Sequence, residues 1–153
     1  MKKYISILLV IVAILSVCAC YDLDRYPEDK INTNTFWKTQ QHAEQGINAI
    51  YAMFQNYYIF GSYFSLDCLG EVGTGYGEHG NENISRGTYN SLDNRILNRW
   101  TYLYEGVARA NLAIQNIPKI HATDSEIATL MGEAKFLRSL FYFYLTDFFG
   151  GVP

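Results

Sequence analysis

The sequence predicts an all-α fold, and three observations lead to that prediction. Three segments place apolar residues at alternating steps of three and four, which is the spacing of one helix face. Each segment begins near a polar residue that can cap a helix, and two of them end at Pro or Gly. With 49% apolar and 18% charged residues, the 153-residue chain is neither a disordered nor a low-complexity sequence.

The first helix is predicted over residues 39–55, with Thr39 as its N-cap. Phe36 and Trp37 stand just before the cap, so they can fold back onto the helix as a hydrophobic staple. The apolar stripe of this helix consists of Ala43, Ile47, Ile50, Phe54 and Tyr57.

Residues 60–91 differ from the helical segments because no apolar period holds there. Six of the twelve glycines fall between Gly70 and Gly87. We expect a long irregular loop with room for a short strand, and loops of that length in compact domains are usually functional or mobile.

The second helix is predicted over residues 93–116, with Asp93 as its cap and Pro118 as its stop. Its stripe consists of Ile96, Trp100, Leu103, Val107, Ala110, Ile114 and Ile117. The third helix is predicted over residues 125–149, capped by Asp124 or Ser125 and ended by the following glycines. Its stripe consists of Ile127, Leu130, Ala134, Leu137, Phe141, Tyr144 and Phe148. Because the connection is short, we expect these two helices to pack antiparallel.

The second and third helices also carry apolar residues outside their stripes. These are Tyr102, Tyr104, Phe136, Tyr142, Phe143, Leu145 and Phe149. Three helices cannot cover so wide a surface, so we expect more helices and an incomplete chain. Helix pairs that need neighbours are typical of helical repeats, and Trp100-x-x-Leu103 loosely resembles the start of a tetratricopeptide repeat.

The first 19 residues have the composition of an export signal, with Lys2 and Lys3 before an apolar run. The run up to Cys20 is shorter than the roughly 20 residues that a transmembrane helix needs. Val17-Cys18-Ala19-Cys20 resembles a bacterial lipobox with Cys20 as the lipidated residue. The alternative is an ordinary signal peptide cut near Cys18, which would give a soluble periplasmic protein.

We therefore divide the chain into a signal peptide (1–19), a lipidated tether (20–34) and an incomplete helical domain (35–153). Only Cys68 then remains in the folded part, so no internal disulfide is expected. The formal charge of −3 becomes more negative once the leader lysines are removed, and no basic run is left. Nucleic acid is consequently not an expected partner.

No catalytic, nucleotide or metal site is expected, and hence no cofactor. Residues 75–80 have G-x-G-x-x-G spacing, but they lie inside a loop and not between a strand and a helix. His42, His79 and His121 stand on separate segments, which disfavours a zinc site. Glu71 and Glu78 lie in the glycine-rich loop, where carboxylates are usually solvated and not a glycosidase pair.

The glycine-rich loop carries the candidate ligand residues, which are Tyr76, Asn81, Asn83, Arg86 and Tyr89. Flat aromatic faces stack on sugar rings, and Asn and Arg side chains hydrogen-bond vicinal hydroxyls. This composition fits a glycan site, and it fits equally a polar loop that contacts a protein partner.

Several short stretches, spread over nearly the whole chain, point together to one known protein family. They are C-Y-D-L-D-R-Y-P at 20–27, F-W-K-T at 36–39, A-I-Y at 49–51, W-x-x-L-Y at 100–104 with A-N at 110–111, G-E-A-K-F-L-R at 132–138, and L-x-x-x-x-G-G-V-P at 145–153. Together they resemble the SusD/RagB family of outer-membrane nutrient-binding lipoproteins of Bacteroidetes. The block at 132–138 and the terminal G-G-V-P are the most specific of these stretches.

The resemblance implies an almost entirely helical fold with tetratricopeptide-like helix pairs. Family proteins are several times longer, so the chain resembles the N-terminal part. The resemblance also implies a protein that is not an enzyme. Such proteins lie on the cell surface over a SusC-like TonB-dependent transporter and pass glycans or other nutrients into it. Asp22 and Asp24 look like the acidic signal that sends such lipoproteins to the outer face.

Three polar residues in the matched stretches, Asn111, Glu133 and Arg138, have a structural interpretation. Glu133 and Arg138 flank apolar residues of the third helix, and Asn111 lies on the second. We interpret the three as a clasp between two packed helices, and not as ligand contacts.

The sequence therefore predicts a surface lipoprotein that binds a nutrient, with glycan as the favoured class. The alternative is a lipid-anchored helical-repeat scaffold that binds only a protein partner. A lipid-anchored hydrolase is the third possibility, although no nucleophile or acid pair is visible for it.

Overall fold

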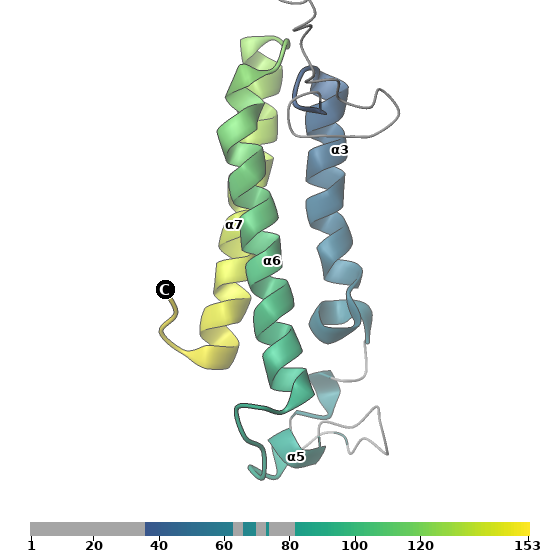
Figure 1. Cartoon of the computed structure of the whole chain (residues 1–153), viewed down its shortest axis with the longest axis vertical. Coiled ribbons are helices and arrows are strands. Elements are labelled where there is room, and N and C mark those ends of the chain that lie inside the picture. The colour runs from purple at the N-terminus through teal and green to yellow at the C-terminus, as the bar shows by residue number, and fades with distance from the viewer. Residues whose placement is uncertain (1–35, 63–65, 70–72, 74–81) are drawn as a thin grey trace, which may run out of the picture. The chain divides into compact units, whose positions relative to one another are not determined.

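The structure, a computed structural model, describes residues 36–62, 66–69, 73 and 82–153. The helices are α3 (Gln40–Tyr51), α5 (Glu82–Ser85), α6 (Asn94–Asn116) and α7 (Asp124–Phe149). Two 3-10 turns (Ala52–Gln55 and Ile117–Lys119) and a π-helical turn (Tyr57–Gly61) join them. The three long helices lie side by side (Figure 1), and the all-α prediction is confirmed. The predictions for residues 1–35, Cys20 included, lie outside the described residues.

The predicted caps of the first two helices are confirmed. Thr39 Oγ1 accepts a hydrogen bond from the His42 amide at 3.3 Å, and Asp93 Oδ1 accepts one from the Arg95 amide at 2.9 Å. Both bonds satisfy amides that the first helical turn leaves without an intrahelical partner.

The predicted cap of the third helix is wrong, because Thr123 takes that position. The Glu126 amide donates to Thr123 Oγ1 at 3.3 Å, and the Thr123 amide donates to Glu126 Oε2 at 2.8 Å. This reciprocal capping box satisfies two amides, whereas Asp124 or Ser125 would satisfy one. Asp124 instead lies in the first turn, where a negative charge favours the helix dipole. At the other end, Gly150 terminates α7 with a φ of 77°, a conformation that favours glycine.

The first helix is shorter than predicted, because α3 ends at Tyr51 and not near Gln55. A 3-10 turn follows, and it has fewer residues per turn than an α-helix. Residues beyond it therefore no longer continue the apolar stripe of α3. Ala43, Ile47 and Ile50 are buried as predicted, but Tyr57 is 38% exposed and does not belong to the core.

Helices α6 and α7 form an antiparallel pair, as predicted. Residues nearer the start of α6 contact residues nearer the end of α7. Asn111 contacts Arg138, Gly106 contacts Phe141, and Trp100 contacts Phe149. The backbones approach closely at Gly106, where an added Cβ would lie 2.4 Å from Phe141 Cε1.

The hydrophobic core lies between the three long helices. Phe141 of α7 stacks on Phe54, with ring centroids 4.6 Å apart. Trp37 folds back against Gly46 of α3, and Phe36 stacks on His42, which confirms the predicted staple. The Lys38 carbonyl accepts a bond from the His121 amide at 2.9 Å and so links the start of α3 to the α6–α7 connection.

The wide apolar surface of α6 and α7 is largely covered, contrary to the prediction. Leu145 is buried, and Tyr102, Tyr104, Tyr142 and Phe149 are half-buried against the core. Only Phe136 and Phe143, at 62% and 59% exposed, leave an open apolar face on α7 among those residues.

The predicted loop over residues 60–91 contains short helical pieces in its described parts. They are the end of the π-helical turn, a turn at 66–69 and α5, where the sequence left room for a strand. Cys68 is buried there with a free thiol. Within the described ranges, no helix is both long and apolar enough to cross a bilayer.

Candidate functional site

A pocket of about 710 Å³ lies where α6 begins and α7 ends. Ligand pockets typically measure roughly 300–1,000 Å³, so this one has room for a sugar-sized molecule. Its lining residues are Tyr57, Tyr58, Leu66, Leu69, Ile84, Tyr89, Arg95, Ile96, Arg99, Asp147, Phe148 and Phe149.

Three tyrosines, Tyr57, Tyr58 and Tyr89, line the pocket. Tyr57 and Tyr58 meet edge to face at 5.2 Å, and Tyr58 stacks on Tyr102 of α6 at 5.7 Å. Tyr89 is 52% exposed, so much of its ring is free to meet a ligand. Tyrosines held in this way offer flat apolar faces with polar tips, which suits sugar rings.

Two arginines from the start of α6 supply positive charge. Arg99 is 9% exposed, and its Cζ atom lies 4.2 Å from the centroid of the Phe148 ring. Arg95 Cζ lies 5.9 Å from the centroid of Tyr57. Burial, and then the positive charge of Arg95, lower the pKa of Arg99 to about 10, so Arg99 stays charged at neutral pH. Asp147 is the one carboxylate among the described lining residues.

A family model described as "Starch-binding associating with outer membrane" matches residues 23–153, nearly the whole chain. The chain belongs to this SusD-like family. The resemblance inferred from the short sequence stretches is therefore confirmed.

Relatives and a solved structure agree with this membership. The SusD-like chain is 27% and 29% identical to the SusD-like proteins P2 and P38 of Formosa agariphila, over its whole length and 31% of theirs. A crystal structure of a SusD homolog from Bacteroides thetaiotaomicron matches with a TM-score of 0.63 and 25% identity. That match covers 82% of this chain and 25% of the homolog. The chain thus spans about a third of the length of the curated relatives it matches.

The structure of this SusD-like chain brings one of the predicted ligand residues into the pocket, Tyr89. Asn83 and Arg86 lie within two residues of Ile84, which does line the pocket, but both are exposed and outside its lining. Tyr76 and Asn81 lie outside the described residues.

Sequence reasoning missed Tyr57, Tyr58, Arg95 and Arg99. Tyr57 was assigned to the core stripe of the first helix. A signal for Arg99 was present, because it stands four residues before Leu103 and therefore on the buried face of α6. Arg95 stands a further four residues back on the same face.

The predicted clasp of this SusD-like chain is divided between two contacts. Arg138 Nη1 donates to Asn111 Oδ1 at 2.9 Å, which links α7 to α6. Glu133 joins neither residue, because its Oε1 accepts a bond from the Tyr51 hydroxyl at 2.8 Å and links α7 to α3. That bond to the carboxylate raises the pKa of Tyr51. None of these residues lines the pocket.

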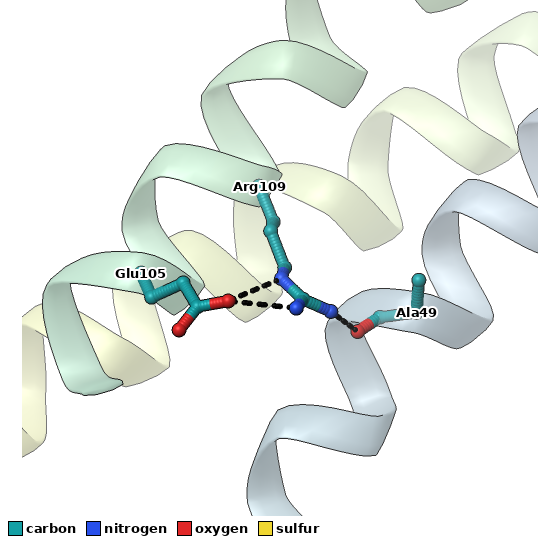
Figure 2. A network of polar contacts seen from close by, with 3 residues as sticks. All are labelled: Ala49, Glu105 and Arg109. Carbon is teal, nitrogen blue, oxygen red and sulfur yellow. Dashed lines mark hydrogen bonds and ion pairs between the residues drawn. The ribbon is translucent and has the colours of Figure 1, made fainter. Parts of the chain in front are cut away.

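A third polar contact links α3 to α6 (Figure 2). Arg109 Nη1 donates to the Ala49 carbonyl at 3.1 Å, while Nε and Nη2 both bond Glu105 Oε1. Each pair of long helices in the described chain therefore has its own polar link.

Proposed function

We propose that this SusD-like chain is part of a cell-surface protein that binds carbohydrate at the outer membrane, with the described pocket as part of its ligand site. The observation that carries the proposal is a ligand-sized pocket walled by Tyr57, Tyr58 and Tyr89. The family description, with its starch binding and outer-membrane association, supports the same class of ligand. The protein binds and does no chemistry of its own.

The proposal includes a partner and an anchor. A SusC-like TonB-dependent transporter receives the bound glycan and carries it across the outer membrane. Lipid on Cys20 holds the protein at the membrane. Palmitate labelling of the wild type and of Cys20→Ser tests the anchor, and equal labelling of the two proteins would contradict it.

A pair of tyrosine variants tests the ligand site. We expect Tyr89→Ala to weaken binding of a glycan found on an array by about tenfold, because an aromatic stacking surface is lost. Tyr51→Ala is the matched control, since Tyr51 is also exposed but lies outside the pocket. Because this variant also loses the bond to Glu133, circular dichroism checks that it is folded. Titration calorimetry measures both. Equal affinities for the two variants would exclude Tyr89 from the site, and no binding to any glycan would overturn the proposed function.

The alternative function is a helical scaffold that binds only a protein partner. Phe136 and Phe143 favour it, because an open apolar face on a helix suits a protein contact. Capture of a protein partner other than a TonB-dependent transporter, without binding to any glycan, would support this alternative.

A further inference from the structure

Arg99 is the most unusual residue of the pocket lining, because it is largely buried and, among the described residues, its charge has no counter-charge beside it. It is 9% exposed, and its aromatic neighbour Phe148 carries no charge. Among the described residues, no hydrogen bond or ion pair involves this side chain. Buried cations are normally paired, since removing a charge from water is costly.

The surroundings of Arg99 add to this cost. Arg95 repels it from one turn away on the same helix. Arg95 stands in the first turn of α6, where the helix dipole is positive and no acidic residue is present. Asp93 caps the helix through the Arg95 amide and does not line the pocket, and Asp147 is an exposed carboxylate. An anion in the pocket would offset the repulsion that Arg99 feels from Arg95 and give Arg99 the counter-charge that the described residues do not supply.

We infer that the pocket takes acidic sugars, whose carboxylate or sulfate ester binds Arg99 and Arg95 while the tyrosines contact the sugar ring. The planar guanidinium offers paired donors that match either group. A neutral glucan such as starch would fill the space but would add no counter-charge to Arg99, for which the described part of the chain provides none. The inference rests on the proposed function, because it names the class of glycan for the same pocket.

Matched oligosaccharides test the inference with the wild-type protein. The first pair is an oligogalacturonide and its carboxyl-reduced counterpart, and the second is a sulfated galactan oligomer and its desulfated form. We expect the acidic member of at least one pair to bind at least about tenfold more tightly in calorimetry. The pair that shows the preference identifies the carboxylate or the sulfate ester as the recognised group.

Two arginine variants locate the preference. Arg99→Gln should remove it, whereas Arg109→Gln should keep it, because Arg109 lies on the same helix outside the pocket. Loss of a buried unpaired cation should leave folding intact, and circular dichroism checks this. If Arg99→Gln does not fold, the wild-type comparison of each acidic oligomer with its neutral form still decides the inference.

The outcomes separate this inference from the proposed function. Binding of neutral glycans without preference for the acidic forms overturns the inference and leaves the function standing. An acidic preference that persists in folded Arg99→Gln places recognition elsewhere and also overturns the inference. Absence of binding to any oligosaccharide overturns the function itself.

Discussion

Arg138 links α7 to α6 through one hydrogen bond to Asn111, in a half-buried setting. Replacing it with Ala leaves the Asn111 carbonyl without that donor, so we expect Arg138→Ala to lower the free energy of unfolding by about 1–3 kcal/mol. Chemical denaturation measures this loss. Glycan affinity should not change, because Arg138 lies outside the pocket. Unchanged stability with lost affinity would instead make Arg138 a ligand residue.

Two helical glycines provide a matched test of close packing. Gly106 meets the rigid ring of Phe141, so Gly106→Ala should destabilise the protein by about 1–3 kcal/mol through overpacking. An added Cβ at Gly132 meets nothing within 4 Å, so Gly132→Ala should stabilise it by about 0.5–1 kcal/mol through helix propensity. Thermal melting compares the two. A melting temperature that rises for Gly106→Ala as well would show that α6 and α7 do not approach closely at Gly106.

At the scale of elements, the capping box makes the start of α7 sensitive to acid. Hydrogen bonds from the Thr123 side chain and backbone lower the pKa of Glu126 below its ordinary 4.5. A lowered pKa means that the carboxylate stabilises the fold above pH 4.5, and that this contribution is lost as pH falls through the folded-state pKa.

Glu126→Gln tests this acid sensitivity. The variant should be less stable than the wild type at neutral pH, and the difference should shrink in acid. Urea denaturation across pH measures both proteins. Thr123→Ala removes the hydroxyl that bonds Glu126 Oε2, so the stability difference between this variant and the wild type should also become smaller in acid. Part of that difference should remain, because the bond from the Glu126 amide to the Thr123 hydroxyl does not depend on pH. Differences that stay constant with pH would contradict the capping-box explanation.

The long helices could be predicted from the sequence because each has an apolar period over most of its length and at least one clear boundary. Asp93 and Gly150 are such boundary signals, and the structure uses both. The end of α3 could not be predicted, since its change to a 3-10 turn is not marked by Pro or Gly. Thr123 was missed although its T-x-x-E pattern was visible, because the neighbouring Asp124 and Ser125 are also good caps.

At the scale of the whole molecule, the pocket could not be predicted because it gathers residues from distant segments. Tyr57, Arg99 and Phe148 each lie in separate elements, and only folding brings them together. Composition did point to tyrosines in the glycine-rich loop, and Tyr89 is indeed in the lining. The residues that line the pocket with Tyr89 include several from the ends of helices. There, the local apolar pattern predicts that a residue is part of the hydrophobic core.

The antiparallel pair of α6 and α7 has a consequence for the order in which the chain assembles. Only residues 117–123 separate α6 from α7, so bringing these two helices together costs little chain entropy. Residues 52–93 separate α3 from α6, so bringing α3 onto the pair costs more. We expect the α6–α7 hairpin to form first and α3 to dock onto it afterwards.

Native-state hydrogen exchange tests this order. Amides in the middle of α3 should exchange through a partial opening that leaves the hairpin protected. Equal protection of all three helices would mean that they form one cooperative unit. If α3 docks last, the stacking of Phe54 on Phe141 forms only at that step. The aromatic core is then completed at the end of folding.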